Sequence, residues 1–118
     1  MQKFIYRIIK IEKVVDGDTI DVMVDLGFGI YHKVRIRLFG IDTPEIYGRV
    51  TEEEKEKGMK AKEFVEKWLE SANELYIKTI KDKKGKYGRY LGIVFNEKEE
   101  ALNEILLNEG LAKVLKFE

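Results

Sequence analysis

Apolar and polar residues alternate along three segments in the first third of the chain. Residues 3–15 are rich in β-branched and aromatic side chains and predict a strand, and residues 18–26 and 31–41 predict two more. Asp16 and Gly17, a pair that accepts positive φ, predict the hairpin turn between the first two strands. The alternation assigns one set of side chains to the core: Ile20, Val22, Val24, Val34, Ile36 and Leu38. On the third strand it directs the opposite set outward: Lys33, Arg35 and Arg37.

The rest of the chain combines helix and strand patterns. Pro44 ends the third strand, and Thr51 and Glu54 have the spacing of a capping box. Apolar residues at helical spacing then predict a helix over residues 52–72, although Gly58 weakens the prediction of its first turns. Two further strands, a short helix and an extended tail follow at residues 75–81, 87–95, 100–109 and 111–117.

This order of elements is typical of the OB-fold. We therefore predict a mainly β protein: a five-stranded OB-fold β-barrel with a helix between strands 3 and 4 and a short C-terminal helix. The chain of 118 residues has the length of one domain, so we expect a single domain over residues 1–118. OB-folds commonly bind oligonucleotides or oligosaccharides, but the fold alone does not determine the chemistry.

Composition restricts the chemistry further. The 22 basic and 22 acidic residues cancel, which excludes a uniformly cationic protein that coats nucleic acid. There is no cysteine and only one histidine, His32, which excludes thiolate nucleophiles and multi-histidine metal sites. No segment has the roughly 20 apolar residues that span a bilayer. We expect no membrane partner and a cytoplasmic protein, or a secreted one if a leader has been removed.

Acidic and basic side chains gather where the predicted strands end. Asp16 and Asp18 flank a glycine; Asp16 suits a turn, whereas Asp18 lies past the turn and is the better functional candidate. Arginines within residues 35–37 precede Asp42 and Glu45, which share a rigid proline turn. Arginines on a strand usually face solvent, but these lead toward two carboxylates. We interpret this segment as a candidate site.

A third cluster spans residues 78–89 and contains a single acid, Asp82. Its cations are Lys78, Lys81, Lys83, Lys84, Lys86 and Arg89. A lysine-rich turn often serves solubility, but in a chain without net charge this cluster is the best candidate for binding a polyanion. Acids, arginines and lysines together indicate phosphoryl chemistry. Carboxylates can hold Ca²⁺ or Mg²⁺, guanidinium groups neutralise phosphate charge, and another carboxylate can activate water.

Four motifs of the chain resemble the signatures of the staphylococcal nuclease-like (thermonuclease) family: DGDT, RLFGIDTPE, KYGR and LNEILLNEGLAKV. They follow the family's order with similar spacing, from about Val14 to Val114. The resemblance implies an OB-fold barrel that hydrolyses phosphodiester bonds of DNA and RNA with Ca²⁺. Its substrate would be single-stranded DNA or RNA, and we expect a monomer.

The resemblance also implies a role for each motif position. The metal ligands would be Asp18, Asp42 and the backbone carbonyl of Thr43. Glu45 would activate water, and Arg37 and Arg89 would stabilise the scissile phosphate. The substrate contacts would be Lys86 and Tyr87, to which we add Lys84 of the lysine-rich turn. No motif position matches Arg35, which we assign to the surface or to a substrate groove.

The C-terminal end departs from the family pattern. The family's prototype has two tyrosines that flank the nucleotide base, where this chain has Lys116 and Glu118, and we expect Phe117 to face the core. Base stacking is therefore weakened, whereas the residues for hydrolysis are retained. Two alternatives stay open: a non-catalytic OB-fold module that binds nucleic acid or protein, and an interaction domain for a sugar or peptide. We favour the nuclease over these alternatives because the chain retains five of the residues that the resemblance implies for hydrolysis: Asp18, Arg37, Asp42, Glu45 and Arg89.

Overall fold

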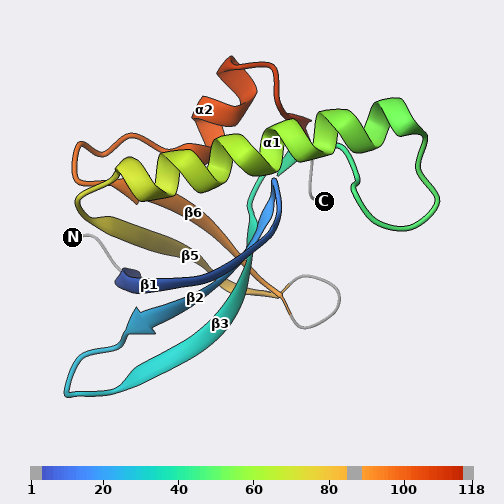
Figure 1. Ribbon diagram of the computed structural model, residues 1–118. Helices are drawn as coiled ribbons and strands as arrows, with labels where there is room; N and C mark the ends of the chain where they lie inside the picture. Colours follow the sequence, from blue (N-terminus) through green and yellow to red (C-terminus); the bar gives the residue numbers. More distant parts are fainter. Residues whose placement is uncertain (1–3, 85–88, 116–118) are drawn as a thin grey trace.

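The structure, a computed structural model, describes the backbone of residues 4–84 and 89–115 and the side chains of residues 4–80 and 89–115. The described elements are β1 (Ile5–Asp16), β2 (Thr19–Asp25), β3 (Tyr31–Leu38), β4 (Ile41–Asp42), α1 (Glu52–Ser71), β5 (Leu75–Lys84), β6 (Tyr90–Asn96), α2 (Leu102–Asn108) and β7 (Lys113–Val114) (Figure 1). Five strands close a barrel in the order β1-β2-β3-β6-β5, and β4 pairs with β7 in a separate sheet. The predicted fold class is confirmed.

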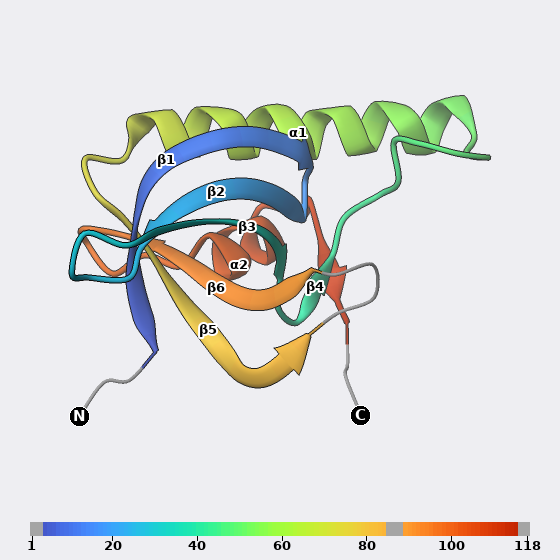
Figure 2. The same cartoon turned by 90° about the horizontal axis from the view of Figure 1, so that it is seen from below.

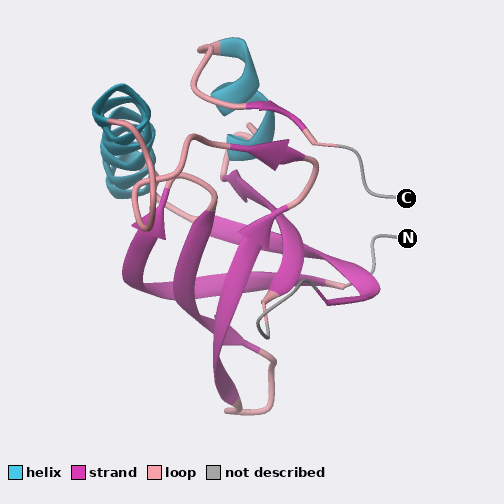
Figure 3. Cartoon of the chain, turned by 90° about the vertical axis from the view of Figure 1, so that its right-hand side faces the viewer, coloured by secondary structure: helices cyan, strands magenta, loops and turns pink. Residues whose placement is uncertain are grey.

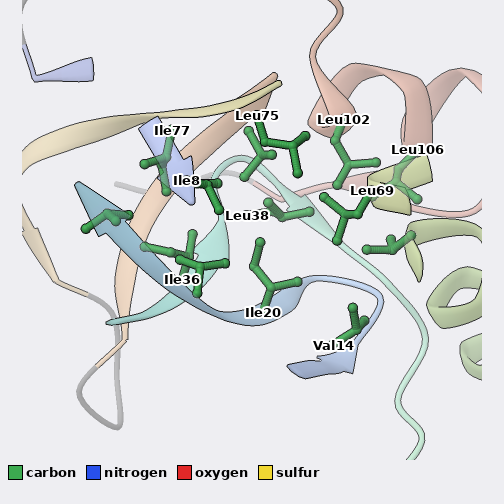
Figure 4. Close-up of a cluster of buried hydrophobic side chains, with 14 of the residues drawn as sticks. Ile8, Val14, Ile20, Ile36, Leu38, Leu69, Leu75, Ile77, Leu102 and Leu106 are labelled. Atoms are coloured by element: carbon green, nitrogen blue, oxygen red, sulfur yellow. The ribbon is translucent and has the colours of Figure 1, made fainter. Parts of the chain in front are cut away.

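The barrel is closed because each of its five strands pairs with two neighbours; β3 and β6 run parallel, and the other neighbours are antiparallel. The predicted alternation of β2 is confirmed, since Ile20, Val22 and Val24 are all buried. Ile20 pairs with Ile36 of β3, so two inward side chains meet across the strands. The core continues from the barrel interior to the inner faces of both helices (Figure 4).

Helix α1 lies along β1 and spans the length of the barrel (Figure 2). Thr51 caps the helix as predicted, because its side-chain oxygen accepts the backbone N–H of Glu54 at 3.1 Å. The helix buries Ala61, Val65 and Leu69 on its inner face. Figure 3 shows both helices toward one end of the molecule and the β2–β3 hairpin at the opposite end. No helix in the described ranges is long and apolar enough to cross a membrane.

The predicted third strand is wrong at its end. It breaks at Phe39 and Gly40, because Gly40 has a φ of +81° and the chain turns there. The turn is fixed by α2, whose buried Asn103 donates from its side-chain nitrogen to the carbonyls of Phe39 (2.9 Å) and Gly92 (3.2 Å). The side-chain oxygen of Asn103 also accepts the backbone N–H of Val94 at 3.2 Å.

The boundaries after the first helix also differ from the prediction. β5 continues to Lys84 into the segment expected to form a turn, because Lys84 pairs again with Tyr90 of β6 after a register shift between Thr79 and Lys84. The predicted tail contains a short strand, β7, whose Lys113 and Val114 pair with β4. This pairing brings the end of the described chain beside Asp42.

Candidate active site

Arg37 lies between two acids at the end of β3. Its Nη1 is 2.6 Å from Oδ2 of Asp18, and its Nη2 donates to Oδ1 of Asp42 at 3.1 Å. Arg37 faces the outer side of the barrel as expected, but it is only 7% exposed. The outward direction therefore does not expose Arg37 to solvent, because the two acids lie against its guanidinium. Three of the residues singled out from the sequence thus meet at one point.

Asp18 is held by several donors. Its Oδ2 accepts the backbone N–H of Thr43 at 3.1 Å, and its Oδ1 accepts the hydroxyl of Thr19 at 3.0 Å. Burial alone would raise the pKa of Asp18, but the hydrogen bond with the Asp16 carboxyl, the charge of Arg37 and these donors hold the pKa below its ordinary value. Asp18 therefore stays ionised in a largely buried position.

Asp16 belongs to the same cluster, although the sequence favoured a turn role for it. Its Oδ1 accepts the backbone N–H of Asp18 at 3.1 Å, which is the expected turn contact. Burial, followed by the hydrogen bond and charge of Asp18 and the charge of Glu45, raises the pKa of Asp16 to about 7. The signal for this second role was the pair of acids two residues apart around one glycine.

Two glycines bring the loops of the site close together. Gly17 does not have the positive φ that we predicted; a Cβ there would lie 2.8 Å from Cβ of Ala61 and 2.9 Å from the Thr43 side chain. A Cβ on Gly58 of α1 would lie 2.7 Å from the carbonyl oxygen of Pro44. Both positions require glycine because of close approach. The sequence suggested Gly58 only as a weak point of the helix.

The loop after β4 carries Thr43 and Glu45. Thr43 is buried, and its Oγ1 has no hydrogen-bond partner among the described residues. Glu45 is exposed and lines a groove of about 480 Å³ between this loop, the start of α1 and the tail near β7. The groove also contains Asp42 and two cations, Lys57 and Lys113. Solvent therefore reaches the site from the side of Glu45.

Arg89 precedes β6 and is half-buried. Tyr90 pairs with Ile36, and Leu91 pairs with Arg37. Arg89 therefore lies directly before β6, the strand that runs beside the end of β3. Of the lysine-rich cluster, Lys78 is exposed on β5. The predicted substrate contacts Lys84, Lys86 and Tyr87 lie outside the described side chains. So do the three C-terminal residues Lys116, Phe117 and Glu118, whose expected roles concerned base stacking and the core.

The donor set is suited to a hard cation. Asp18 and Asp42 both carry carboxylate oxygens of the kind that hard cations prefer, and both converge on one cationic group, Arg37. The unsatisfied Oγ1 of Thr43 is a further buried oxygen beside them. Within the described ranges, however, no group of three acidic or histidine side chains could hold a metal ion by itself. A bound Ca²⁺ would therefore need a backbone oxygen or water in addition to the two carboxylates.

Comparison with known proteins gives consistent similarities. The family model described as staphylococcal nuclease homologue matches residues 35–118. An uncharacterised protein of Methanocaldococcus jannaschii is 40% identical over 124 residues, which cover 89% of this chain and 58% of that protein. The endonuclease YhcR of Bacillus subtilis is 30% identical over 106 residues, covering 86% of this chain and 8% of that protein. The chain thus spans little more than half of one relative and a small part of the other.

Proposed function

Because the chain belongs to the staphylococcal nuclease homologue family, we propose that it is a Ca²⁺-dependent nuclease that hydrolyses phosphodiester bonds of DNA, RNA or both. One observation carries the proposal: the guanidinium of Arg37 is buried between Asp18 and Asp42, next to a groove that is open to solvent. Such a site combines preorganised positive charge for a phosphate with oxygen ligands for a divalent cation. The similarity to the Bacillus endonuclease supports the same activity.

Asp18, Asp42 and the carbonyl of Thr43 would hold the Ca²⁺. When bound, the ion supplies Lewis-acid polarisation of a phosphoryl oxygen. Arg37 is oriented by its contacts with both acids, and its Nη1 makes only an ionic contact without hydrogen-bond geometry. This nitrogen is buried against Asp18, so in our proposal Arg37 keeps a fixed direction and its charge would stabilise a phosphate that enters beside the two acids.

Glu45 and Arg89 complete the proposed machinery. Glu45 is exposed and lines the groove, where it would accept a proton from water that enters from solvent. Arg89 would stabilise the same phosphate from the strand beside Arg37. Lys84, Lys86 and Tyr87 are proposed as contacts for the neighbouring phosphate of the substrate.

The direct test is cleavage of single-stranded DNA and RNA by the purified protein, with Ca²⁺, with Mg²⁺ or with chelator. We expect cleavage with Ca²⁺, little with Mg²⁺ because two carboxylates and a carbonyl form an irregular site, and none with chelator. Binding without cleavage under every condition would favour the non-catalytic module instead. Full activity in chelator would contradict the proposed role of Asp18 and Asp42.

A further inference from the structure

Outward side chains of β3 form a row that leads into the candidate active site. Alternate residues of this strand, Tyr31, Lys33, Arg35 and Arg37, pair with outward residues of β2. The first three are exposed, and Arg37 at the end of the row is buried in the site. Tyr31 and Arg37 are six residues apart on one strand, which corresponds to about 20 Å.

Cations flank the middle strand on both sides. Lys10 of β1 and Lys33 of β3 are the cross-strand neighbours of Met23, an uncharged residue of β2. In the next row Lys13 and Arg35 are the neighbours of Asp21, to which Arg35 donates two hydrogen bonds of 2.6 and 2.9 Å. At the hairpin end a second acid, Asp25, is the neighbour of Arg7 and Tyr31. Taken together, these cross-strand rows still contain more cations than acids, although the whole chain has no net charge.

Lys33 is the outward cation of β3 that has no ion pair among the described residues. Its side chain is exposed. Arg35, by contrast, is neutralised by Asp21, and Lys10 lies 3.8 Å from a carboxylate oxygen of Glu12. The unbalanced charge on β3 is therefore at Lys33, two residues from Arg35 and four from Arg37.

The row ends at an aromatic tip on the β2–β3 hairpin. Tyr31 is 58% exposed, and Phe28 at the turn is fully exposed. Phe28 has a φ of +56°, and its neighbours Gly27 and Gly29 also have positive φ angles. A non-glycine residue in this region is strained, and an exposed ring gains nothing from the fold in return. The tip lies at the opposite end of β2 and β3 from the site (Figure 2).

We propose that this β3 track, defined as Phe28, Tyr31 and Lys33, binds the single-stranded flank of the nucleic-acid substrate. The inference rests on the proposed nuclease function and adds where the strand runs: from Arg37 along the outer face of β3 to the hairpin tip. Lys33 binds a phosphate, and the two aromatic rings stack on bases beyond it.

The spacing and chemistry of the track favour this occupant. Outward residues of one strand repeat about every 6.7 Å, a separation similar to that of successive phosphates in an extended single strand. Stacking platforms combined with a cationic path are the usual features of single-strand binding without sequence preference. Because the row of outward β3 residues ends at Arg37, one nucleic-acid strand bound at the site accounts for both the unpaired charge of Lys33 and the exposed rings.

Equilibrium binding of oligothymidylates in chelator, where no cleavage is expected, tests the phosphate contact. A decanucleotide should bind more tightly than a trinucleotide, because only the longer strand reaches the track. Lys33→Gln should lower the ratio of the two affinities and reduce the salt slope for the decanucleotide by about 0.7. The matched control is Lys67→Gln on the exposed side of α1, which should leave both quantities unchanged.

Three variants test the stacking. Phe28→Gly keeps a residue that tolerates a positive φ, and we expect it to fold at least as stably as the parent. It should weaken decanucleotide binding by about tenfold, as should Tyr31→Ser. Phe28→Leu keeps an apolar side chain but removes the π-face. It should lose as much affinity as Phe28→Gly if the ring stacks on a base.

The outcomes separate the track from the proposed function. Equal affinities for the two oligomers, or a Lys33→Gln variant with an unchanged salt slope, overturn the track even if the protein cleaves DNA. Full retention of decanucleotide affinity by Phe28→Leu overturns the stacking and indicates an apolar partner for the tip. Failure of Ca²⁺ to promote cleavage of either oligomer, with the length preference intact, overturns the nuclease proposal alone.

Discussion

The buried positive charge of Arg37 is balanced by the negative charges of Asp18 and Asp42. Arg37 is nearly inaccessible, and so is Asp18, whose side chain is 8% exposed. Neither ion would be tolerated there alone, because an unpaired buried charge destabilises a folded protein strongly. The pair is therefore structural as well as catalytic in our proposal, and variants of Arg37 must keep its charge if activity is to be separated from folding.

Arg37→Lys meets that condition. The lysine keeps the charge beside Asp18 but cannot present two nitrogens in a plane. We expect kcat for DNA cleavage to fall by about a hundred- to a thousandfold, the usual effect of losing one preorganised donor. Steady-state kinetics with urea unfolding as a folding check would measure this.

Arg35→Lys is the matched control for that experiment. Arg35 is 47% exposed in its side chain and paired with Asp21 on the outer face. We expect far less loss of kcat there. Equal losses at both positions would contradict the assignment of Arg37 as the phosphate-binding arginine.

Asp16 should make the metal-free protein less stable as the pH rises. Its pKa is about 7 in the folded protein, against an ordinary value of 3.8, so the folded state binds more protons than the unfolded state between those limits. The free energy of unfolding therefore decreases with rising pH in that range. Asp16→Asn removes this contribution and should be more stable than the parent at pH 8 by about 1–2 kcal/mol, after allowance for the partial exposure.

Urea unfolding in chelator at pH 5 and pH 8 measures the difference. The advantage of Asp16→Asn should be small at pH 5 and larger at pH 8. An advantage that is the same at both values would mean that Asp16 ionises normally and that its burial beside Asp18 has no energetic consequence. A variant less stable than the parent at pH 8 would show that the turn hydrogen bond to Asp18 outweighs the charge.

At the scale of elements, the site depends on how closely α1 approaches the loop after β4. Gly58 faces this loop and is buried, and its missing side chain leaves space for the carbonyls of Pro44 and Glu45. The helix thereby packs closely against the backbone of the loop that carries Glu45. A residue favourable to an isolated helix is therefore unfavourable at this position, because the neighbour is backbone and cannot rotate away.

Gly58→Ala tests this packing by the sign of its effect. Helix propensity alone predicts a stabilisation of about 1 kcal/mol. We expect instead a destabilisation of about 1–3 kcal/mol, since the new Cβ would lie 2.7 Å from a carbonyl oxygen. Chemical denaturation measures the change, and Glu56→Ala on the exposed side of the same helix is the control. A more stable Gly58→Ala protein would contradict the close approach.

At the scale of the whole molecule, a metal ion would join segments that are far apart in the chain. Asp18 follows the first strand and Asp42 belongs to β4, so binding an ion between them links two loops. Ligand binding to the folded state alone raises stability by about 2.7 kcal/mol at a hundredfold excess over the dissociation constant.

Calcium should therefore raise the midpoint of thermal unfolding, and the increase should depend on Ca²⁺ concentration. Mg²⁺ should raise it less at the same concentration. Asp42→Asn should remove most of the increase, because it lowers the charge of the site and leaves a weaker oxygen ligand. This readout is independent of catalysis. An unchanged midpoint over a wide range of Ca²⁺ concentrations would argue against a resident calcium site.

Much of the architecture was predictable because it depends on local patterns. Period-two alternation determined which face of β2 is buried, and the capping spacing of Thr51 and Glu54 located the start of α1. The acids and arginines of the candidate site were also predictable by type and order. Each lies in a motif whose resemblance to a family could be recognised along the chain.

The tertiary structure decided the features that depend on contacts between distant segments. The break at Gly40 requires Asn103, which is 63 residues later in the chain, and the pairing of β7 with β4 exists only once the barrel has closed. The burial of Arg37, the shifted pKa of Asp16 and the need for glycine at positions 17 and 58 all follow from neighbours that no local pattern specifies. Periodicity assigns a side chain to a face, whereas its burial and ionisation depend on what the rest of the chain places against that face.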